Sequence, residues 1–192
     1  MKKPINYLKI IITLCLIVIA TLNINAQGFK GLDKSPQDIA YFRESKVTKP
    51  LVKVIYGRPS IKNEDTAFGD VVAFGNLWRT GANEATEIKL FQDTFFGDKL
   101  ITAGTYVLLT IPGEKEWEII LNSNLDVFGA FQYDPKADIA RITVPVTKAE
   151  RLNTFSIGFK RKENEVLMVL TWDSTRVKIP LRFKEQIFYA KL

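Results

Sequence analysis

The side chains best suited to chemistry gather in one polar segment, residues 77–86. Its apolar residues keep neither the two-residue period of a half-buried strand nor the longer period of a helix, which predicts a connection between elements. Trp78 offers a flat ring for stacking, and Arg79 offers a guanidinium group for an anion. Asn83 and Glu84 offer hydrogen bonds to hydroxyl groups. Residues of these types, so closely spaced, indicate a ligand-binding connection.

Arg58 is a fifth candidate for the same site, because it ends a predicted strand that could lie beside the polar segment. A purely structural interpretation of the five residues is also open. Trp78 would then plug one end of the fold, while Arg79 and Glu84 would pair with each other or with the backbone. Gly81 would serve a turn that needs a positive φ angle, and Arg58 would belong to an ordinary strand-ending turn.

The composition removes several classes of catalytic site. The chain contains no histidine, and its single cysteine, Cys15, lies in the N-terminal apolar run. A Ser-His-Asp triad, a cysteine nucleophile and the usual zinc sites therefore cannot form in a mature chain that lacks this run. Carboxylate chemistry remains open. Glu84, Asp126 and Asp134 are candidates for the general acid and base of a hydrolase that acts on sugars or cell-envelope polymers.

No metal ion or cofactor is expected from the sequence. Residues 122–126 alternate oxygen-bearing side chains, as a calcium loop does. They lack the glycine and the bidentate glutamate of an EF-hand, so an asparagine-rich turn is the favoured interpretation.

The first 26 residues have the layout of a secretory signal peptide. Basic residues precede an apolar run from Ile10 to Leu22, and small and polar residues lead to Ala26. The run is shorter than the roughly 20 residues that span a bilayer as a helix. We therefore expect cleavage near Ala26, no stable membrane insertion afterwards, and export to the periplasm or out of the cell.

The mature chain would contain no cysteine, so its stability would come from burial alone. Removal of Lys2, Lys3 and Lys9 would leave 24 Lys and Arg against 21 Asp and Glu, a formal charge of +3 in place of +6. Nucleic acid is not an expected partner, because its binding requires basic residues clustered on one face. A small molecule, a glycan or an envelope component is expected instead.

Short strands are predicted over most of the remaining sequence. An N-terminal extension, residues 27–50, contains a helix start at Ser35, and one short helix is expected there. Beyond it, apolar and polar residues alternate between turns rich in Gly, Pro and Asn. About eight to ten antiparallel strands are expected, in an all-β sandwich or barrel-like domain over residues 51–184. Residues 185–192 would form a C-terminal tail.

A long and unusual set of motifs runs through the chain: Val54-Ile55-Tyr56-Gly57-Arg58-Pro59-Ser60, Phe68-Gly69, Trp78-Arg79-Thr80-Gly81-Ala82-Asn83-Glu84-Ala85-Thr86, Ala103-Gly104-Thr105-Tyr106, Ile111-Pro112, Trp117, Asn122, Gly129-Ala130 and Tyr133-Asp134. From about Leu32 to Phe183 the sequence closely resembles the domain of unknown function (DUF) 2911 family of exported bacterial proteins. The resemblance implies a single β-rich exported domain and assigns no activity to it.

Two positions depart from the family that the motifs resemble. A basic Lys-Gly-Arg stretch often follows the Arg-Pro turn, whereas this chain has Lys62-Asn63-Glu64-Asp65 there. Members commonly carry Trp before the Gly-Ala pair, whereas this chain has Phe128. A ligand that touches those positions would therefore be bound differently here.

The leading hypothesis is a binding or interaction module whose site contains Arg58, Trp78, Arg79, Asn83 and Glu84. A hydrolase with Glu84 as acid or base is the alternative, and a purely structural envelope protein is the third hypothesis. The position of Glu84 separates the three. An open cleft with a second carboxylate favours the hydrolase, an open cleft without one favours binding, and burial against Arg79 favours a structural role.

Overall fold

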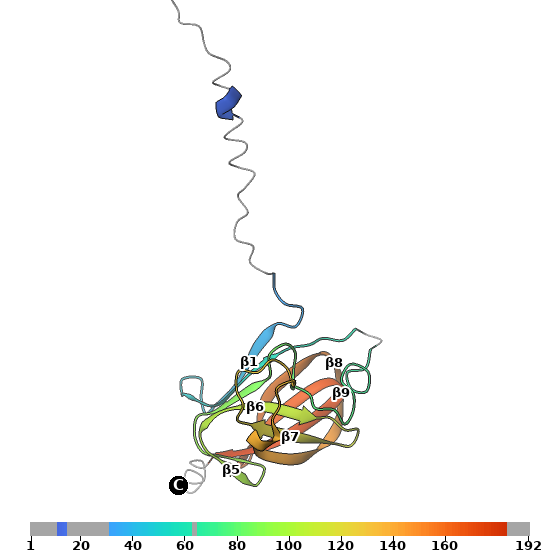
Figure 1. Ribbon diagram of the computed structural model, residues 1–192. Coiled ribbons are helices and arrows are strands. Elements are labelled where there is room, and N and C mark those ends of the chain that lie inside the picture. Colours follow the sequence, from blue (N-terminus) through green and yellow to red (C-terminus); the bar gives the residue numbers. More distant parts are fainter. Residues whose placement is uncertain (1–10, 15–30, 63–64, 184–192) are drawn as a thin grey trace, which may run out of the picture. The chain divides into compact units, whose positions relative to one another are not determined.

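The computed structural model describes residues 11–14, 31–62 and 65–183 (Figure 1). The chain divides into two compact units, residues 1–32 and 33–192. In the first unit, residues 11–14 are helical, and the rest of the predicted signal peptide lies outside the described residues, as does the predicted tail. Within the described ranges, no helix has the length and apolar character needed to cross a membrane.

The second unit is all β. Its described residues form nine strands in one antiparallel sheet, in the order β1-β2-β3-β6-β7-β8-β9-β4-β5, and one short 3-10 helix, η1 (Pro135–Ala137). The strands are β1 (Gln37–Arg43), β2 (Pro50–Gly57), β3 (Glu87–Leu90), β4 (Thr94–Phe96), β5 (Lys99–Ile101), β6 (Gly104–Ile111), β7 (Glu116–Asn122), β8 (Asp138–Lys162) and β9 (Glu165–Phe183). The predicted all-β class and the predicted antiparallel strands are confirmed.

The helix predicted in the N-terminal extension is wrong, because strand β1 occupies that stretch and pairs with β2. The pairing continues beyond the strand, since the Arg58 amide donates to the Pro36 carbonyl (3.0 Å). Phe42 faces the core and stacks on Phe183, with ring centroids 6.0 Å apart. Long-range pairing and burial of one strand face therefore override the local helix signal at Ser35.

Two long strands fold the sheet over on itself. Strand β8 pairs with β7 along its first part and with β9 along its second part, and the β8–β9 register shifts between Lys148 and Ser156. The sheet stays open, yet β1 and β8 approach each other, since the rings of Phe42 and Phe159 lie 6.2 Å apart. The inward-facing side chains of the sheet enclose one main core. The architecture is intermediate between a β-sandwich and a β-barrel (Figure 1).

Aromatic rings fill the core beside the connection between β2 and β3. Trp78 and Phe68 come from this connection, and they meet side chains of β7, β8 and β9: Trp117, Phe155 and Trp172. The Phe68 ring contacts the indoles of Trp78, Trp117 and Trp172 edge-on, with centroid distances of 4.7 to 5.7 Å. This arrangement suits aromatic quadrupoles and ties the long connection to the sheet.

A second, smaller apolar cluster covers part of the sheet's outer face. Its buried members come from β6, β7 and the polar segment: Ala85, Val107, Leu109 and Ile120. Val127 and Tyr133, from the connection between β7 and η1, pack against this cluster. The outer face of β1, β2 and β3 continues beyond it and carries exposed side chains such as Ile39 and Tyr41.

Candidate functional site

A close backbone contact places the polar segment against the end of β2. A Cβ atom on Gly57 would lie 2.1 Å from the Ala82 carbonyl oxygen, and one on Gly81 would lie 2.9 Å from the Gly57 carbonyl oxygen. Only residues without a Cβ atom allow this approach. Thr80 and Asn83 have φ angles of 57° and 61°, so the chain turns sharply on both sides of the contact.

Buried hydrogen bonds hold the turn in this conformation. Trp78 exchanges both backbone hydrogen bonds with Thr110 of β6, at 2.7 and 2.9 Å. The Thr80 hydroxyl donates to the Thr110 hydroxyl (3.1 Å), and the Thr86 hydroxyl donates to the Thr80 carbonyl (2.8 Å). The positive φ of a β-branched residue is unfavourable, and this network compensates for it. The segment is therefore a fixed wall beside the sheet.

Two adjoining cavities of about 190 and 270 Å³ lie between this wall and the outer face of the sheet. They share Gln37, Glu84 and Ala85, and together they form what we call the groove. Among the described residues, no Lys or Arg lines the groove. Four carboxylates do line it: Asp33, Glu84, Glu87 and Asp126.

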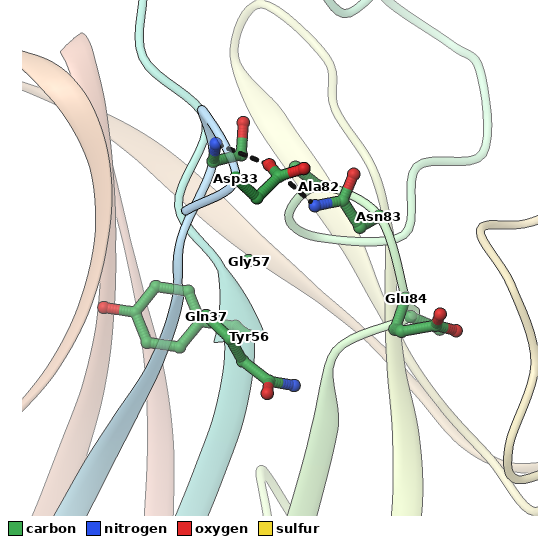
Figure 2. Close-up of a pocket in the computed structure, with 9 residues that line it drawn as sticks. Asp33, Gln37, Tyr56, Gly57, Ala82, Asn83 and Glu84 are labelled. Carbon is green, nitrogen blue, oxygen red and sulfur yellow. Dashed lines mark hydrogen bonds between the residues drawn. The ribbon is translucent and has the colours of Figure 1, made fainter. Parts of the chain in front are cut away.

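A side-chain hydrogen bond joins two residues that line the smaller cavity, Asp33 and Asn83. The Asp33 carboxylate accepts hydrogen bonds from the Ser35 amide (2.7 Å) and from Asn83 Nδ2 (3.1 Å). These bonds stabilise its charged form, the bond from Ser35 most strongly, and hold the pKa of Asp33 below its ordinary value. In Figure 2 the Asp33–Asn83 bond lies above Gln37, with Glu84 on the opposite wall.

Glu84 is exposed and lines both cavities. Of the two pairings that the structural interpretation allows Arg79, the ion pair with Glu84 does not occur in the part of the chain that the structure describes, and the pairing with the backbone does. Arg79 Nη1 donates instead to the Asn83 carbonyl (3.3 Å), and the guanidinium carbon lies 5.9 Å from the Phe128 ring centroid. Glu84 forms a β-bridge with Phe128, which joins the polar segment to the connection after β7. The carboxylate of Glu84 thus borders an open groove.

Trp78 lies in the core, with 8% of its surface exposed, and lines neither cavity. Its Nε1 donates to the Gly81 carbonyl (3.0 Å), and its ring stacks on Trp172 at a centroid distance of 6.0 Å. This burial matches the structural interpretation of Trp78, since the indole holds the polar segment in place and presents no face to the groove.

Arg58 also serves internal contacts. It donates from Nε to the Phe155 carbonyl (3.1 Å), from Nη2 to the Ser156 hydroxyl (2.8 Å) and from Nη1 to Asp38 (3.0 Å). Beside it, the Tyr56 hydroxyl accepts a hydrogen bond from the Ile157 amide (3.0 Å). These side chains fasten β2 to β8, and Arg58 lines neither cavity.

Of the five predicted site residues, the structure brings Asn83 and Glu84 into the groove and leaves Arg79 beside it. The groove also contains residues that the sequence analysis did not single out: Asp33, Gln37 and Glu87. Glu87 could have been found, because it alternates with buried Ile88 and therefore points to the outer face. Gln37 lies in the stretch predicted to be helical, where the alternation of a strand was not expected to place it on the outer face.

The other predicted carboxylates separate in space. Asp126 lines the larger cavity together with Glu84 and Glu87. Asp134 instead caps η1 and accepts a hydrogen bond from the Lys136 amide (2.9 Å). The tertiary structure therefore leaves Glu84, Glu87 and Asp126 as the carboxylates that share one cavity.

Residues 122–126 form a turn whose amides are engaged internally. Asn122 Nδ2 donates to the Asp134 carbonyl and to the Asp138 carboxylate, both at 2.9 Å, and Asn124 Nδ2 donates to the Gln132 carbonyl (2.9 Å). In the described ranges, no group of three or more His, Cys, Asp or Glu residues has the geometry to hold a metal ion.

Comparisons with known proteins give one match. No curated protein and no solved structure matches the chain. A family model described as a protein of unknown function (DUF2911) matches residues 35–181. This range includes all nine described strands apart from the last residues of β9, the polar segment, and every groove residue except Asp33. The chain therefore belongs to the DUF2911 family.

Proposed function

We propose that the protein is a binding module whose ligand lies in the groove beside residues 77–86. The observation that carries this proposal is the groove itself, which has four carboxylates in its lining and no basic side chain among the described residues. Ligand sites are concave and contain a few fixed polar groups. The Asp33–Asn83 bond and the glycine contact supply such fixed groups here.

The lining favours a hydroxylated ligand that also carries positive charge. Ionised carboxylates only accept hydrogen bonds, and the amides of Gln37 and Asn83 can both donate and accept. Both cavities are smaller than the roughly 300 to 1,000 Å³ of a drug-sized site, so each would hold one ring and a longer ligand would span both. An amino-sugar oligomer has this chemistry.

Binding can be tested by titrating the purified protein calorimetrically with a glucosamine oligosaccharide and with its N-acetylated counterpart. We expect the charged oligomer to bind more tightly. Glu84→Gln should weaken its binding by about tenfold, equivalent to about 1.4 kcal/mol. Glu150→Gln, which removes an exposed carboxylate from β8 away from the groove, is the matched control. Equal losses in both variants, or equal affinity for both oligomers, would contradict the proposal.

A carboxylate-based hydrolase is the second candidate, and it is supported by the cavity that Glu84 shares with Glu87 and Asp126. Hydrolysis of a glycosidic bond uses two carboxyl groups, one as acid and one as base or nucleophile. The test is to incubate the oligosaccharide with the protein and to measure new reducing ends. Release that persists unchanged in both Glu84→Gln and Glu87→Gln would exclude these residues as the acid and base.

A purely structural role predicts a different behaviour of Glu84. If Glu84 supported the fold, then Glu84→Gln would lower the melting temperature. Because this side chain is exposed and has no described ion pair, we expect the melting temperature to stay unchanged. A fall of several degrees would favour the structural role over the binding role.

We further propose that the protein acts outside the cytoplasm, in the periplasm or beyond the cell. The basic residues and the apolar run before Ala26 support this location. Mass spectrometry of the protein from its native cells should find an N-terminus just after Ala26. An intact Met1 on the native protein would contradict export by cleavage.

A further inference from the structure

The outer face of β1, β2 and β3 exposes apolar side chains beside the groove. Ile39 and Tyr41 of β1 are 45% and 44% exposed, and Phe91, just after β3, is 40% exposed. On β2 and β3 the alternate residues, such as Val54 and Ile88, are fully buried in the core. These exposed side chains therefore share one face of a rigid sheet, which is a larger apolar surface than scattered single residues would make.

The strand register arranges this face in two adjacent rows. The first row runs Ile39–Ile55–Glu87, and the second runs Tyr41–Lys53–Lys89. Each row crosses the three strands in the same order, from an apolar side chain on β1 to a charged side chain on β3. The rows carry opposite charge on β3, and they lie two residues apart, about 7 Å along the strand.

The two lysines stand directly opposite each other, since Lys53 pairs with Lys89 in the β2–β3 register. Like charges in this position destabilise a sheet. Within the described residues, neither lysine forms an ion pair, and Glu87 forms none either. Lys89 instead lies over the ring of Phe91 at 5.1 Å. The face thus has an unpaired basic row next to a row that ends in an unpaired acid.

We propose that two copies of this chain associate through this face, around a two-fold axis that runs between the rows. Such an axis places the first row of one copy over the second row of the other. Glu87 of each copy then meets the partner's Lys89, and Ile39 meets the partner's Tyr41. An isologous interface requires this self-complementarity, and the paired charges set its register.

This inference does not depend on the proposed function, although Ile55 and Glu87 belong both to the face and to the larger cavity, so that a dimer would cover part of that cavity. Self-association is measured without any ligand. Glu84 lies outside the two rows, so Glu84→Gln should leave the dimer intact. A failure of ligand binding and a failure of dimerisation are therefore separate results.

The test is a charge exchange followed by sedimentation equilibrium of the purified protein. Wild type should dimerise, and both Lys89→Glu and Glu87→Lys should raise the dimer dissociation constant by about tenfold or more. The double variant, with both substitutions, should return it to near the wild-type value, because the two charges have only changed places. Lys178→Glu, an exposed position on β9, should have no effect.

Two outcomes would overturn the inference. The first is a monomer at every concentration from micromolar to millimolar. The second is a dimer that the single reversals weaken but the double variant does not restore. Melting curves check that each variant is folded. If a charge reversal fails to fold, Tyr41→Ser provides an independent test, since loss of this exposed ring should weaken a true dimer and leave a monomer's behaviour unchanged.

Discussion

Gly57 lacks a side chain at the point where the carbonyl of Ala82 occupies the space of a Cβ atom. The contact lets the polar segment lie against β2, and it directs Asn83 and Glu84 toward the groove. The candidate site thus depends on residues that carry no functional group, while two of its predicted members, Trp78 and Arg58, make internal contacts. Each of these roles follows from which atoms lie within contact distance.

Gly57→Ala should lower the free energy of unfolding by about 1–3 kcal/mol, because the new methyl group would force the two backbones apart. Chemical denaturation with both variants measures the effect. Gly158→Ala is the matched control, since a Cβ atom there would meet nothing within 4 Å. The control should be neutral or slightly stabilising, because alanine favours a strand more than glycine does. Similar behaviour of the two variants would show that the Gly57 contact is not tight.

At the scale of elements, the connection between β2 and β3 covers the aromatic part of the core, and Arg151 attaches one part of it to β8. Arg151 of β8 donates from Nη2 to the carbonyls of Lys62 (3.3 Å) and Asp65 (2.8 Å). Arg151 also pairs with Asp173, whose carboxylate accepts from the Ala67 amide (3.3 Å). This ion pair holds the part of the connection that inserts Phe68 among the tryptophans.

Arg151→Ala should therefore loosen this connection without unfolding the protein. The Arg151 side chain is 40% exposed, so the expected loss of global stability is only about 0.5–1 kcal/mol. Hydrogen exchange of the Ala67 and Phe68 amides should become several-fold faster, because local opening no longer breaks the bonds to Arg151. Lys148→Ala, on the same strand, is the control. Exchange rates that match in the two variants would rule out Arg151 as the attachment.

At the scale of the whole molecule, side-chain hydrogen bonds join β2 and β8, which do not pair with each other as strands. The sheet does not close, and at the edge of β8 the Ile157 amide donates to the Tyr56 hydroxyl while the Phe155 carbonyl accepts from Arg58 Nε. Burial disfavours the tyrosinate and is the main reason that the pKa of Tyr56 lies above its ordinary value. The folded state therefore favours the neutral hydroxyl at this junction.

Stability should consequently be lost at alkaline pH. A pKa that is higher in the folded state than in the unfolded state contributes stability below the unfolded value, near 10.0, and this contribution disappears as the pH rises through the folded value. Thermal unfolding between pH 8 and roughly pH 11 measures the effect. Tyr56→Phe should be less stable at neutral pH by about 1–2 kcal/mol, because the Ile157 amide loses its acceptor, and it should show a smaller alkaline fall. An unchanged fall would contradict this role. Tyr41→Phe, at an exposed position, serves as the control.

The sequence by itself determined the all-β class, most of the strands and the place of the polar segment between them. Alternation such as that of Ile88 and Leu90 with Glu87 and Lys89 is a local property, because the side-chain period of a strand follows from its own backbone. The absence of histidine likewise limited the chemistry without reference to any structure.

Only the tertiary structure decided which side chains share a site. Strand β1 forms where a helix start was predicted, because pairing with β2 and packing on β8 stabilise the strand. Trp78 is buried by aromatic residues that lie up to 94 positions later in the sequence. Asp33 accepts a hydrogen bond from Asn83, which lies 50 positions away in the sequence. Such contacts join residues that are far apart in the sequence, so no local pattern predicts them. For this reason the groove became visible only when distant segments were brought together.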